Sequence, residues 1–466
     1  MNFICNNKKI FILFKKHKSG EISTSDELTI DGIGSFLEKK GHTLLIKGYA
    51  GAGKTTLALQ LLKRLGGEKG VYISSRVSPK KLQQQIPWVG DSPKSEMVDV
   101  RVGLAASVLE EIVRAVSEKA PVVVLDTWDG LAKEMDEKER LKAEKTLIAL
   151  ADGSETRVIF VSEEPGKTTM DYLVDGIIEL VRSEEYGRVF REVEVQKLRG
   201  TLIDQHKYLY TLYKGQFKHF HPYREPEHSK LSPVTPKKDT EKGYSFGSDD
   251  LDRAFKGIEK GATVTIEYTP KVPYSALRTL FLPLVVNFLS LGRGVVHLPL
   301  PGASPHALLK LVGACVKDLK LYRLAVPGSS KDFSAPLFGF SEEQVKEAHK
   351  NVSEKLEEVK RLSVDGHALI VDSIGLLENM FSPNLNELLQ ALAARASRVQ
   401  REEDIAVFLL PSDSKIKPEI LSMSNTHIRV ISKDRSIVVM GEKPETEAYV
   451  VEHDQNPILP KLWVIV

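Results

Sequence analysis

Short apolar runs rich in β-branched residues alternate with stretches of helical periodicity along most of the chain. The runs show no polar alternation, which is typical of parallel strands that are covered on both faces. In the first half, the predicted strands span residues 43–47, 70–74, 122–126 and 157–162, and the predicted helices include 55–65 and 105–119. This order predicts an α/β fold, with a mostly parallel sheet and helices on both of its faces.

The second half of the chain repeats the order of the first. Its predicted strands span residues 263–267, 294–298, 368–372 and 405–410, with a helix at 277–291 and a β-rich end. Because the elements recur in the same order, we predict two tandem copies of one domain.

A polar, proline-interrupted stretch separates the two copies and predicts an interdomain linker. We expect an N-terminal basic and apolar arm or strand at 1–22, a first domain at 23–215, the linker at 216–242 and a second domain at 243–466. Three linker histidines, His219, His221 and His228, have no acidic or cysteine partner at ligand spacing. We therefore expect solvated histidines there and no metal site.

Composition excludes several classes of protein. The 466 residues are 42% hydrophobic and 27% charged, as in globular proteins, and a net charge of +2 gives no global field for nucleic acid or an anionic membrane. Cys5 and Cys315 cannot build a disulfide framework or a cysteine zinc site, which favours a reducing cytoplasm. The apolar stretch 10–14 is too short to span a membrane.

A complete GxxxxGK[ST] motif, residues 48–55, lies directly between a predicted strand and a predicted helix. In such a loop, backbone N–H groups and the helix N-terminus surround phosphate oxygens. We expect Lys54 to reach the β- and γ-phosphates and Thr55 to bind Mg²⁺. The predicted phosphate-binding residues are Gly48, Ala50, Gly51, Ala52, Gly53, Lys54, Thr55 and Thr56.

The strand at 122–126 is apolar until it ends in Asp126. Its carboxylate should lie at the same edge of the sheet as the phosphate loop and direct Mg²⁺, as a Walker B residue. A capping role for Asp126 at the following helix is compatible with this one.

The second copy has lost the phosphate loop. A gapless alignment of 43–47 with 263–267 places Tyr268 opposite Gly48, Pro273 opposite Gly53 and Tyr274 opposite Lys54. Asp372 ends its strand as Asp126 does, and we expect it to persist as a helix cap or polar anchor. We predict a degenerate domain that does not bind nucleotide.

These motifs resemble the RecA superfamily and, within it, the KaiC/RadA-like ATPases. The resemblance is carried by the phosphate loop with Ser78-Pro79 downstream, by 175–180 with the later Lys197-Leu198-Arg199-Gly200, and by 246–252. It implies ATP as the nucleotide, although the sequence itself leaves ATP and GTP open. It also implies a ring or filament in which Lys197 and Arg199 reach the γ-phosphate of a neighbouring copy.

The resemblance breaks at the glutamate that serves the family as catalytic base. Arg76 and Val77 stand at its position, so we expect slow hydrolysis or none. Glu163 and Asp129 are substitute candidates, and either can instead be a surface or capping carboxylate.

The stretch Ser75-Arg76-Val77-Ser78 is similar to the archaeal gas-vesicle regulator family GvpD, which implies a regulatory role. We therefore expect an Mg-ATP-dependent regulatory or assembly switch, homo-oligomeric and with a protein partner. One alternative is a recombinase-like DNA-dependent ATPase, which the balanced charge and Arg76 disfavour. Another is an autokinase, which no residue selects.

Overall fold

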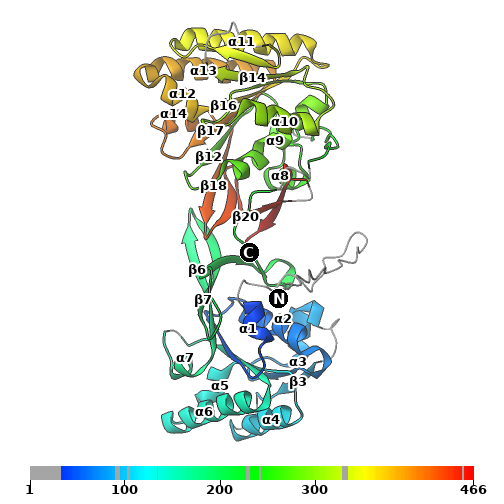
Figure 1. Ribbon diagram of the computed structural model, residues 1–466, viewed down its shortest axis with the longest axis vertical. Coiled ribbons are helices and arrows are strands. Elements are labelled where there is room, and N and C mark those ends of the chain that lie inside the picture. The colour runs from blue at the N-terminus through cyan, green and yellow to red at the C-terminus, as the bar shows by residue number, and fades with distance from the viewer. Residues whose placement is uncertain are drawn as a thin grey trace, which may run out of the picture.

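The computed structural model describes residues 33–89, 95–101, 105–133, 135–164, 166–226, 231–240, 243–327, 334–453 and 456–466. The segment 1–22, for which the sequence predicts an arm or strand, lies outside these residues, as do Cys5 and His228. Figure 1 shows two α/β domains placed end to end. The predicted fold class, two tandem α/β domains with mostly parallel central strands and helices on both faces, is confirmed.

The first domain contains a nine-stranded sheet in the order β3-β2-β4-β5-β1-β6-β7-β8-β9. Pairing is parallel from β3 through β6 and antiparallel from β6 through β9. The strands are β1 (Thr43–Gly48), β2 (Val71–Ser74), β3 (Glu96–Asp99), β4 (Val122–Asp126), β5 (Arg157–Ser162), β6 (Gly176–Glu185), β7 (Arg188–Leu198), β8 (Lys207–Thr211) and β9 (Lys218–His219).

Helices cover both faces of this sheet. The leucines of α2 pack on the face that carries Val122 and Val124, whereas buried side chains of α4 and α6 pack on the face that carries Val123 and Leu125. Successive strand residues point to opposite faces, so β4 is apolar without alternation. The helices are α1 (Ile33–Glu38), α2 (Lys54–Gly66), α3 (Pro79–Gln85), α4 (Ala105–Ser117), α5 (Trp128–Ala132), α6 (Glu137–Ser154) and α7 (Thr169–Leu173).

The second domain contains a ten-stranded sheet in the order β15-β14-β13-β16-β17-β12-β18-β19-β20-β21 and a separate β10–β11 pair. The strands are β10 (Gly243–Tyr244), β11 (Ile258–Glu259), β12 (Thr263–Tyr268), β13 (Gly294–His297), β14 (Tyr322–Pro327), β15 (Leu337–Phe340), β16 (Ala368–Ser373), β17 (Ile405–Pro411), β18 (Thr426–Lys433), β19 (Ser436–Lys443), β20 (Glu445–His453) and β21 (Pro460–Val464). The helices are α8 (Asp249–Phe255), α9 (Tyr274–Ser290), α10 (Pro305–Cys315), α11 (Val345–Leu362), α12 (Ile374–Met380), α13 (Leu385–Glu402) and α14 (Lys417–Ser422).

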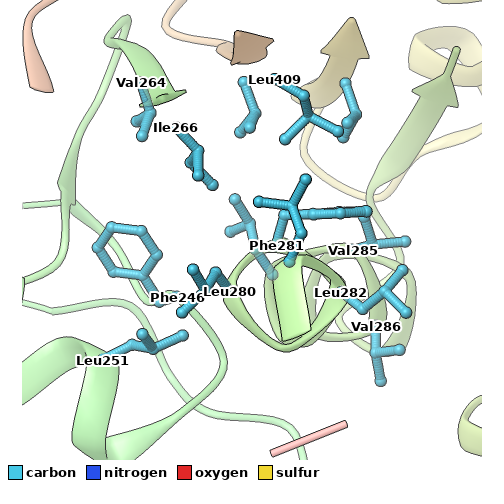
Figure 2. Close-up of a cluster of buried hydrophobic side chains, with 14 of the residues drawn as sticks. Phe246, Leu251, Val264, Ile266, Leu280, Phe281, Leu282, Val285, Val286 and Leu409 are labelled. Carbon is cyan, nitrogen blue, oxygen red and sulfur yellow. The ribbon is translucent and has the colours of Figure 1, made fainter. Parts of the chain in front are cut away.

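The core of the second domain forms around α9, which is apolar on all sides. Figure 2 shows side chains of this helix pointing outward on several sides, with Val264, Ile266 and Leu409 of the sheet on one side and Phe246 and Leu251 on another. A helix that is hydrophobic all round has to be buried all round. This helix is the counterpart of α2, so the second copy has turned a helix with an exposed side into a core element.

The two domains share details that strand order alone does not require. In the first, the register between β6 and β7 shifts between Ile177 and Ile178. In the second, the register between β18 and β19 shifts between His427 and Ile428. Both pairs occupy the same place relative to the central strand, since Gly176 pairs with Leu44 and Thr426 with Val264. A shared β-bulge supports the predicted duplication.

The predicted linker makes specific contacts with the second domain. Asp239 forms an ion pair with Arg293 at 2.7 Å, and the backbone N–H of Lys237 donates to Asn287 Oδ1 at 2.7 Å. The expectation of solvated histidines is wrong for His219, which is 2% exposed. It lies on the short edge strand β9, paired with Tyr210, where prolines nearby hide the strand pattern. His221 is exposed. Among the described residues, no group of three potential metal ligands occurs.

The two domains meet through an apolar core of their own. Phe190 of β7 and Leu209 of β8 pack in one cluster with Val438 of β19. Beside this cluster, the buried Arg188 guanidinium donates to the carbonyl oxygen of Gly441 at 2.7 Å. Figure 1 shows the β6–β7 hairpin reaching from the first domain to β18.

In the part of the chain that the structure describes, no helix is long and apolar enough to cross a membrane.

A buried carboxylate, Glu267, is the penultimate residue of the central strand β12 of the second domain and is 2% exposed. His427 Nε2 lies 2.8 Å from its Oε2, Lys417 Nζ contacts its other oxygen and Arg429 lies 3.6 Å away. Burial alone would raise the pKa of this carboxyl, but hydrogen bonds from His427 and Lys417 outweigh it and lower the pKa to about 2. A depressed pKa stabilises the folded state above the ordinary carboxyl pKa, and this contribution is lost as the pH falls toward 2.

We predict that Glu267→Gln lowers the free energy of unfolding near neutral pH by on the order of 3 kcal/mol. The gap to the wild type should shrink as the pH falls from 4.5 toward about 2, because the wild-type carboxylate becomes protonated there. Urea unfolding across this range measures both values. The exposed Glu354→Gln is the matched control and should change stability by less than about 0.5 kcal/mol. A gap that stays constant with pH would contradict the assignment.

Candidate functional site

The phosphate loop follows β1 and is shaped by three glycines with positive φ. These angles are 146° at Gly48, 80° at Gly51 and 90° at Gly53. A Cβ at Gly48 would lie 2.5 Å from the Leu180 carbonyl oxygen, and one at Gly53 would lie 2.6 Å from the Leu212 side chain. A Cβ at Gly51 would meet nothing within 4 Å. Packing therefore requires the outer glycines, while the middle one leaves the loop open on one side.

The loop ends in α2, whose first turn is available to an anion. Among the described residues, no side chain caps this helix start, where Gly53 precedes Lys54. Uncapped N–H groups and the positive end of the helix dipole favour phosphate. Of the predicted phosphate-binding residues, Ala50 is exposed, Ala52 is buried, and Thr55 and Thr56 lie partly exposed on the first turn.

Lys54 points back into the loop. Its Nζ donates to the carbonyl oxygens of Gly48 at 2.9 Å and Tyr49 at 2.8 Å, and its side chain is 5% exposed. Burial lowers the pKa of this ammonium group, and the nearby Glu163 carboxylate opposes the shift. The structure thus holds a desolvated cation at the mouth of the loop, where a phosphate oxygen would gain most from it.

Asp126 lies beside the loop, as the sequence predicts. Its Oδ2 accepts hydrogen bonds from Thr55 Oγ1 and from Tyr72 OH, each at 2.6 Å. Burial raises the pKa of this carboxyl, and the two hydroxyl donors partly offset the shift. A threonine hydroxyl held by a carboxylate next to a phosphate cradle is an oxygen donor set that suits Mg²⁺. Tyr72 is a member of this group that sequence reasoning missed.

Glu163 and Arg76 form an ion pair next to Lys54. Glu163 Oε1 lies 3.5 Å from Lys54 Nζ, and its Oε2 contacts Arg76 Nη1. Asp129, a buried substitute candidate, accepts hydrogen bonds from Ser162 Oγ at 2.9 Å and from the Glu163 backbone N–H. Both carboxylate oxygens of Asp129 therefore accept hydrogen bonds from the end of β5 and the residue after it. Of the two substitute candidates, Glu163 is the one whose carboxylate lies next to Lys54.

Two further side chains support the loop from the neighbouring strands β7 and β8. Arg191 Nη1 donates to Tyr49 OH at 2.8 Å and to the Gly51 carbonyl oxygen at 3.2 Å. Tyr210 OH donates to the Ala52 carbonyl oxygen at 2.7 Å. The sequence does not predict either contact, because Arg191 and Tyr210 lie far from the loop in the chain and only the pairing of the strands brings them to it.

Lys197 and Arg199 lie far from the loop of their own chain. Lys197 pairs with Ile177, which is level with Leu45 near the start of β1, whereas the phosphate loop follows its end. Lys197 Nζ donates to the Val174 carbonyl oxygen at 2.6 Å, and Arg199 Nη1 to Asp175 Oδ1 at 3.1 Å. Any contact of these residues with a phosphate at Lys54 would have to be made with another copy.

The second domain has none of the loop geometry at the matching place. Tyr274 begins α9 where Lys54 begins α2, and burial raises the pKa of its hydroxyl to about 12. The Walker B correspondence proposed for Asp372 is wrong by one residue. In the first domain, the strand pairing puts Val123 level with Thr43, the first residue of β1. In the second domain, it puts Ile370 level with Thr263, the first residue of β12. Counting three residues on from each, Ser373 is level with Asp126.

Asp372 therefore points to the opposite face of its sheet. It is fully buried and forms an ion pair with Arg395 of α13, so it is a polar anchor. The helix cap is Ser373, whose side chain accepts from the Leu376 backbone N–H. Because successive residues of a strand point to opposite faces of the sheet, a shift of one residue moves the carboxylate to the face opposite the one that carries Asp126 in the first domain.

The matches to known proteins follow this geometry. A family model described as the P-loop domain of the GvpD gas vesicle protein matches residues 34–196. Protein GvpD2 of Halobacterium salinarum is 25% identical, covering 92% of this chain and 94% of that protein. Protein GvpD1 of the same organism is 28% identical, covering 59% and 56%.

Among solved structures, a KaiC-like protein from the archaeon Pyrococcus horikoshii matches with a TM-score of 0.36 and 23% identity, covering 39% of this chain and 90% of that one. The GvpD model spans the loop, Asp126 and Glu163, all within the first domain. With its intact phosphate loop, the chain is a P-loop protein that is similar to the GvpD proteins, and the loop lies in the first of its two α/β domains.

Proposed function

We propose that the first domain binds Mg-ATP and that its occupancy alters assembly or partner binding through the second domain, so that the protein acts as a regulatory switch. Lys54 and the loop amides would hold the phosphates, while Thr55 and Asp126 would hold Mg²⁺. The metal would neutralise phosphate charge. Slow hydrolysis or none is expected, since Arg76 stands where the related ATPases carry their catalytic glutamate.

One observation supports the switch more than any other. Strands β7 and β8 contact the phosphate loop with one face and the second domain with the other. Arg191 and Tyr210 reach the loop, whereas Phe190 and Leu209 lie in the interdomain core. Because neighbouring residues of a strand point to opposite faces, any shift of the loop is transmitted to the interface across a single layer of backbone.

The second domain is then the responding part. Thr211, the last residue of β8, donates through Oγ1 to the Val464 carbonyl oxygen at 2.7 Å, which adds a contact to the end of β21. The degenerate loop at Tyr274 leaves this domain without a nucleotide of its own. It is therefore suited to report on the first domain by its position or by the surface that it exposes.

For assembly, the chain itself suggests different roles for the two basic residues of the Lys197–Gly200 element. Lys443 holds the ladder position of Lys197 and makes the same kind of bond, to the Ser424 carbonyl oxygen at 2.8 Å. Since this lysine persists in a domain that lacks a phosphate loop, we assign it a structural role. The second domain has Glu445 two residues later, where Arg199 stands in the first. Arg199 is thus the better candidate for contact with a neighbouring copy.

We predict that Lys54→Ala weakens ATP binding by about 100-fold, or about 2.7 kcal/mol, because a buried charge-assisted contact is lost. It should also abolish any change of oligomer size that ATP causes in the wild type. Titration calorimetry and light scattering measure the two effects. Lys69→Ala, an exposed lysine beyond the same helix, should behave as the wild type. Equal size distributions of the wild type with and without ATP would remove the assembly switch.

We also predict that saturating ATP slows amide exchange in β19 and β20 of the wild type, and that Arg191→Met loses most of this protection while still binding ATP. The reason is that Arg191 joins the loop to β7, which carries Phe190 into the interface. Hydrogen-exchange mass spectrometry of residues 436–453 measures the effect. Arg182→Met is the matched control, since Arg182 is exposed and pairs with Arg191 across the ladder. Full protection in Arg191→Met would exclude this route.

A further inference from the structure

Glu163 lies where it would compete with a γ-phosphate for the Lys54 ammonium group. Lys54 Nζ is held 2.9 Å from the Gly48 carbonyl oxygen, inside the loop, and this ammonium group is the one that reaches β- and γ-phosphates. Glu163 Oε1 lies 3.5 Å from the same nitrogen. A carboxylate and a phosphate oxygen compete for such a cation, because both are anions that accept its hydrogen bonds.

Arg76 contacts the other oxygen of the same carboxylate. Its guanidinium and the Lys54 ammonium therefore lie on either side of one anion. The loop that carries Arg76 is held in place, because Ser75 Oγ donates to the Thr127 carbonyl oxygen at 2.9 Å and Ser74 Oγ donates to the Val77 carbonyl oxygen at 2.7 Å. Arg76 thus follows β2 on a fixed backbone directed toward the mouth of the phosphate loop.

The Arg76–Glu163 pair contributes little to folding. The Arg76 side chain is 54% exposed and that of Glu163 32%, and exposed ion pairs of this kind contribute only about 0–1 kcal/mol. A ligand can therefore separate the pair at small cost. By contrast, Asp126 and Asp129 are buried and engaged by hydroxyl and backbone donors, so they stay in place.

We propose that Arg76 is a specificity-determining residue that reads the γ-phosphate in cis, and that Glu163 is a displaceable carboxylate which holds Arg76 and Lys54 until a nucleoside triphosphate arrives. The γ-phosphate takes over both cations from Glu163. A diphosphate reaches Lys54 but not Arg76. The site therefore distinguishes tri- from diphosphate by contact, without cleaving a bond. This inference rests on the proposed function of the first domain.

Arg76→Ala tests the contact directly. Isothermal titration with the full chain and Mg²⁺ should show ATP affinity lowered by about 10- to 100-fold and ADP affinity changed by less than about threefold. Arg76→Lys should retain part of the preference for ATP, because charge remains while the forked donor geometry is lost. Lys81→Ala, an exposed lysine of α3, is the control for removal of one positive charge and should leave both affinities unchanged.

Glu163→Gln separates the two roles open to this residue. As a displaceable anion, its loss should raise ATP affinity by several-fold. As a catalytic base, its loss would leave affinity unchanged and stop any phosphate release, which would overturn the proposal for Glu163. Adding Arg76→Ala to Glu163→Gln should lower ATP affinity again, because Arg76 contacts the phosphate itself. If the double variant binds ATP as tightly as Glu163→Gln alone, Arg76 does not read the γ-phosphate.

The wild-type affinities for ADP and ATP distinguish a failure of this inference from a failure of the proposed function. If the wild type binds neither ADP nor ATP, the nucleotide site itself is wrong. If it binds both, and Arg76→Ala keeps the wild-type ratio of the two affinities, only the present inference fails. Thermal unfolding by circular dichroism checks that each variant is folded.

Discussion

The parallel pairing of β1 with β5, and of β5 with β4, is the constraint on which the site depends. It places the carboxyl ends of three strands at one edge, so that the phosphate loop, Glu163 and Asp126 meet there although they are remote in the chain. The second domain has the same pairing among β12, β17 and β16. Strand pairing alone therefore brings the three strand ends together in both domains. The glycines and Lys54 of the loop are what make this edge a candidate phosphate site in the first domain. Tyr268 and Tyr274 at the matching positions remove the site and leave the sheet intact.

Comparison of the two copies separates structural from functional residues within one molecule. Both copies keep the β-bulge, in the β6–β7 pair and in the β18–β19 pair. Both also keep a lysine, Lys197 or Lys443, that donates to the carbonyl oxygen two residues before β6 or β18. A feature retained without a phosphate loop serves the fold. What only the first copy keeps is the loop and Asp126, with Arg76 beside them. This division separates the residues that serve the fold of both domains from those of the candidate phosphate site, which only the first domain has.

Sequence patterns predict most of this fold and part of the site. The apolar runs at 122–126 and 157–162 coincide with β4 and β5, and the motif at 48–55 predicts the loop, because both signals are local. The sequence pattern does not predict where a side chain points when this depends on the register between paired strands. Asp372 and Asp126 both end an apolar run, yet one faces α13 and the other the loop, since the register differs by one residue. Arg191 and Tyr210 have no local signal at all, and the prolines after His219 hide the short strand that buries it.

The size of any switch is limited by how differently the site treats its ligands. A ligand shifts two states only by its differential affinity, so contacts shared by ATP and ADP cannot drive a response to one over the other. In the proposed binding mode, Lys54 and the loop amides would contact both nucleotides, whereas Arg76 would contact only the γ-phosphate of ATP. A 10- to 100-fold preference corresponds to about 1.4–2.7 kcal/mol, enough to reverse an equilibrium between two nearly balanced arrangements of the domains. Strands β7 and β8 contact both the loop and the interdomain core, which is what would let so small a difference act on the second domain.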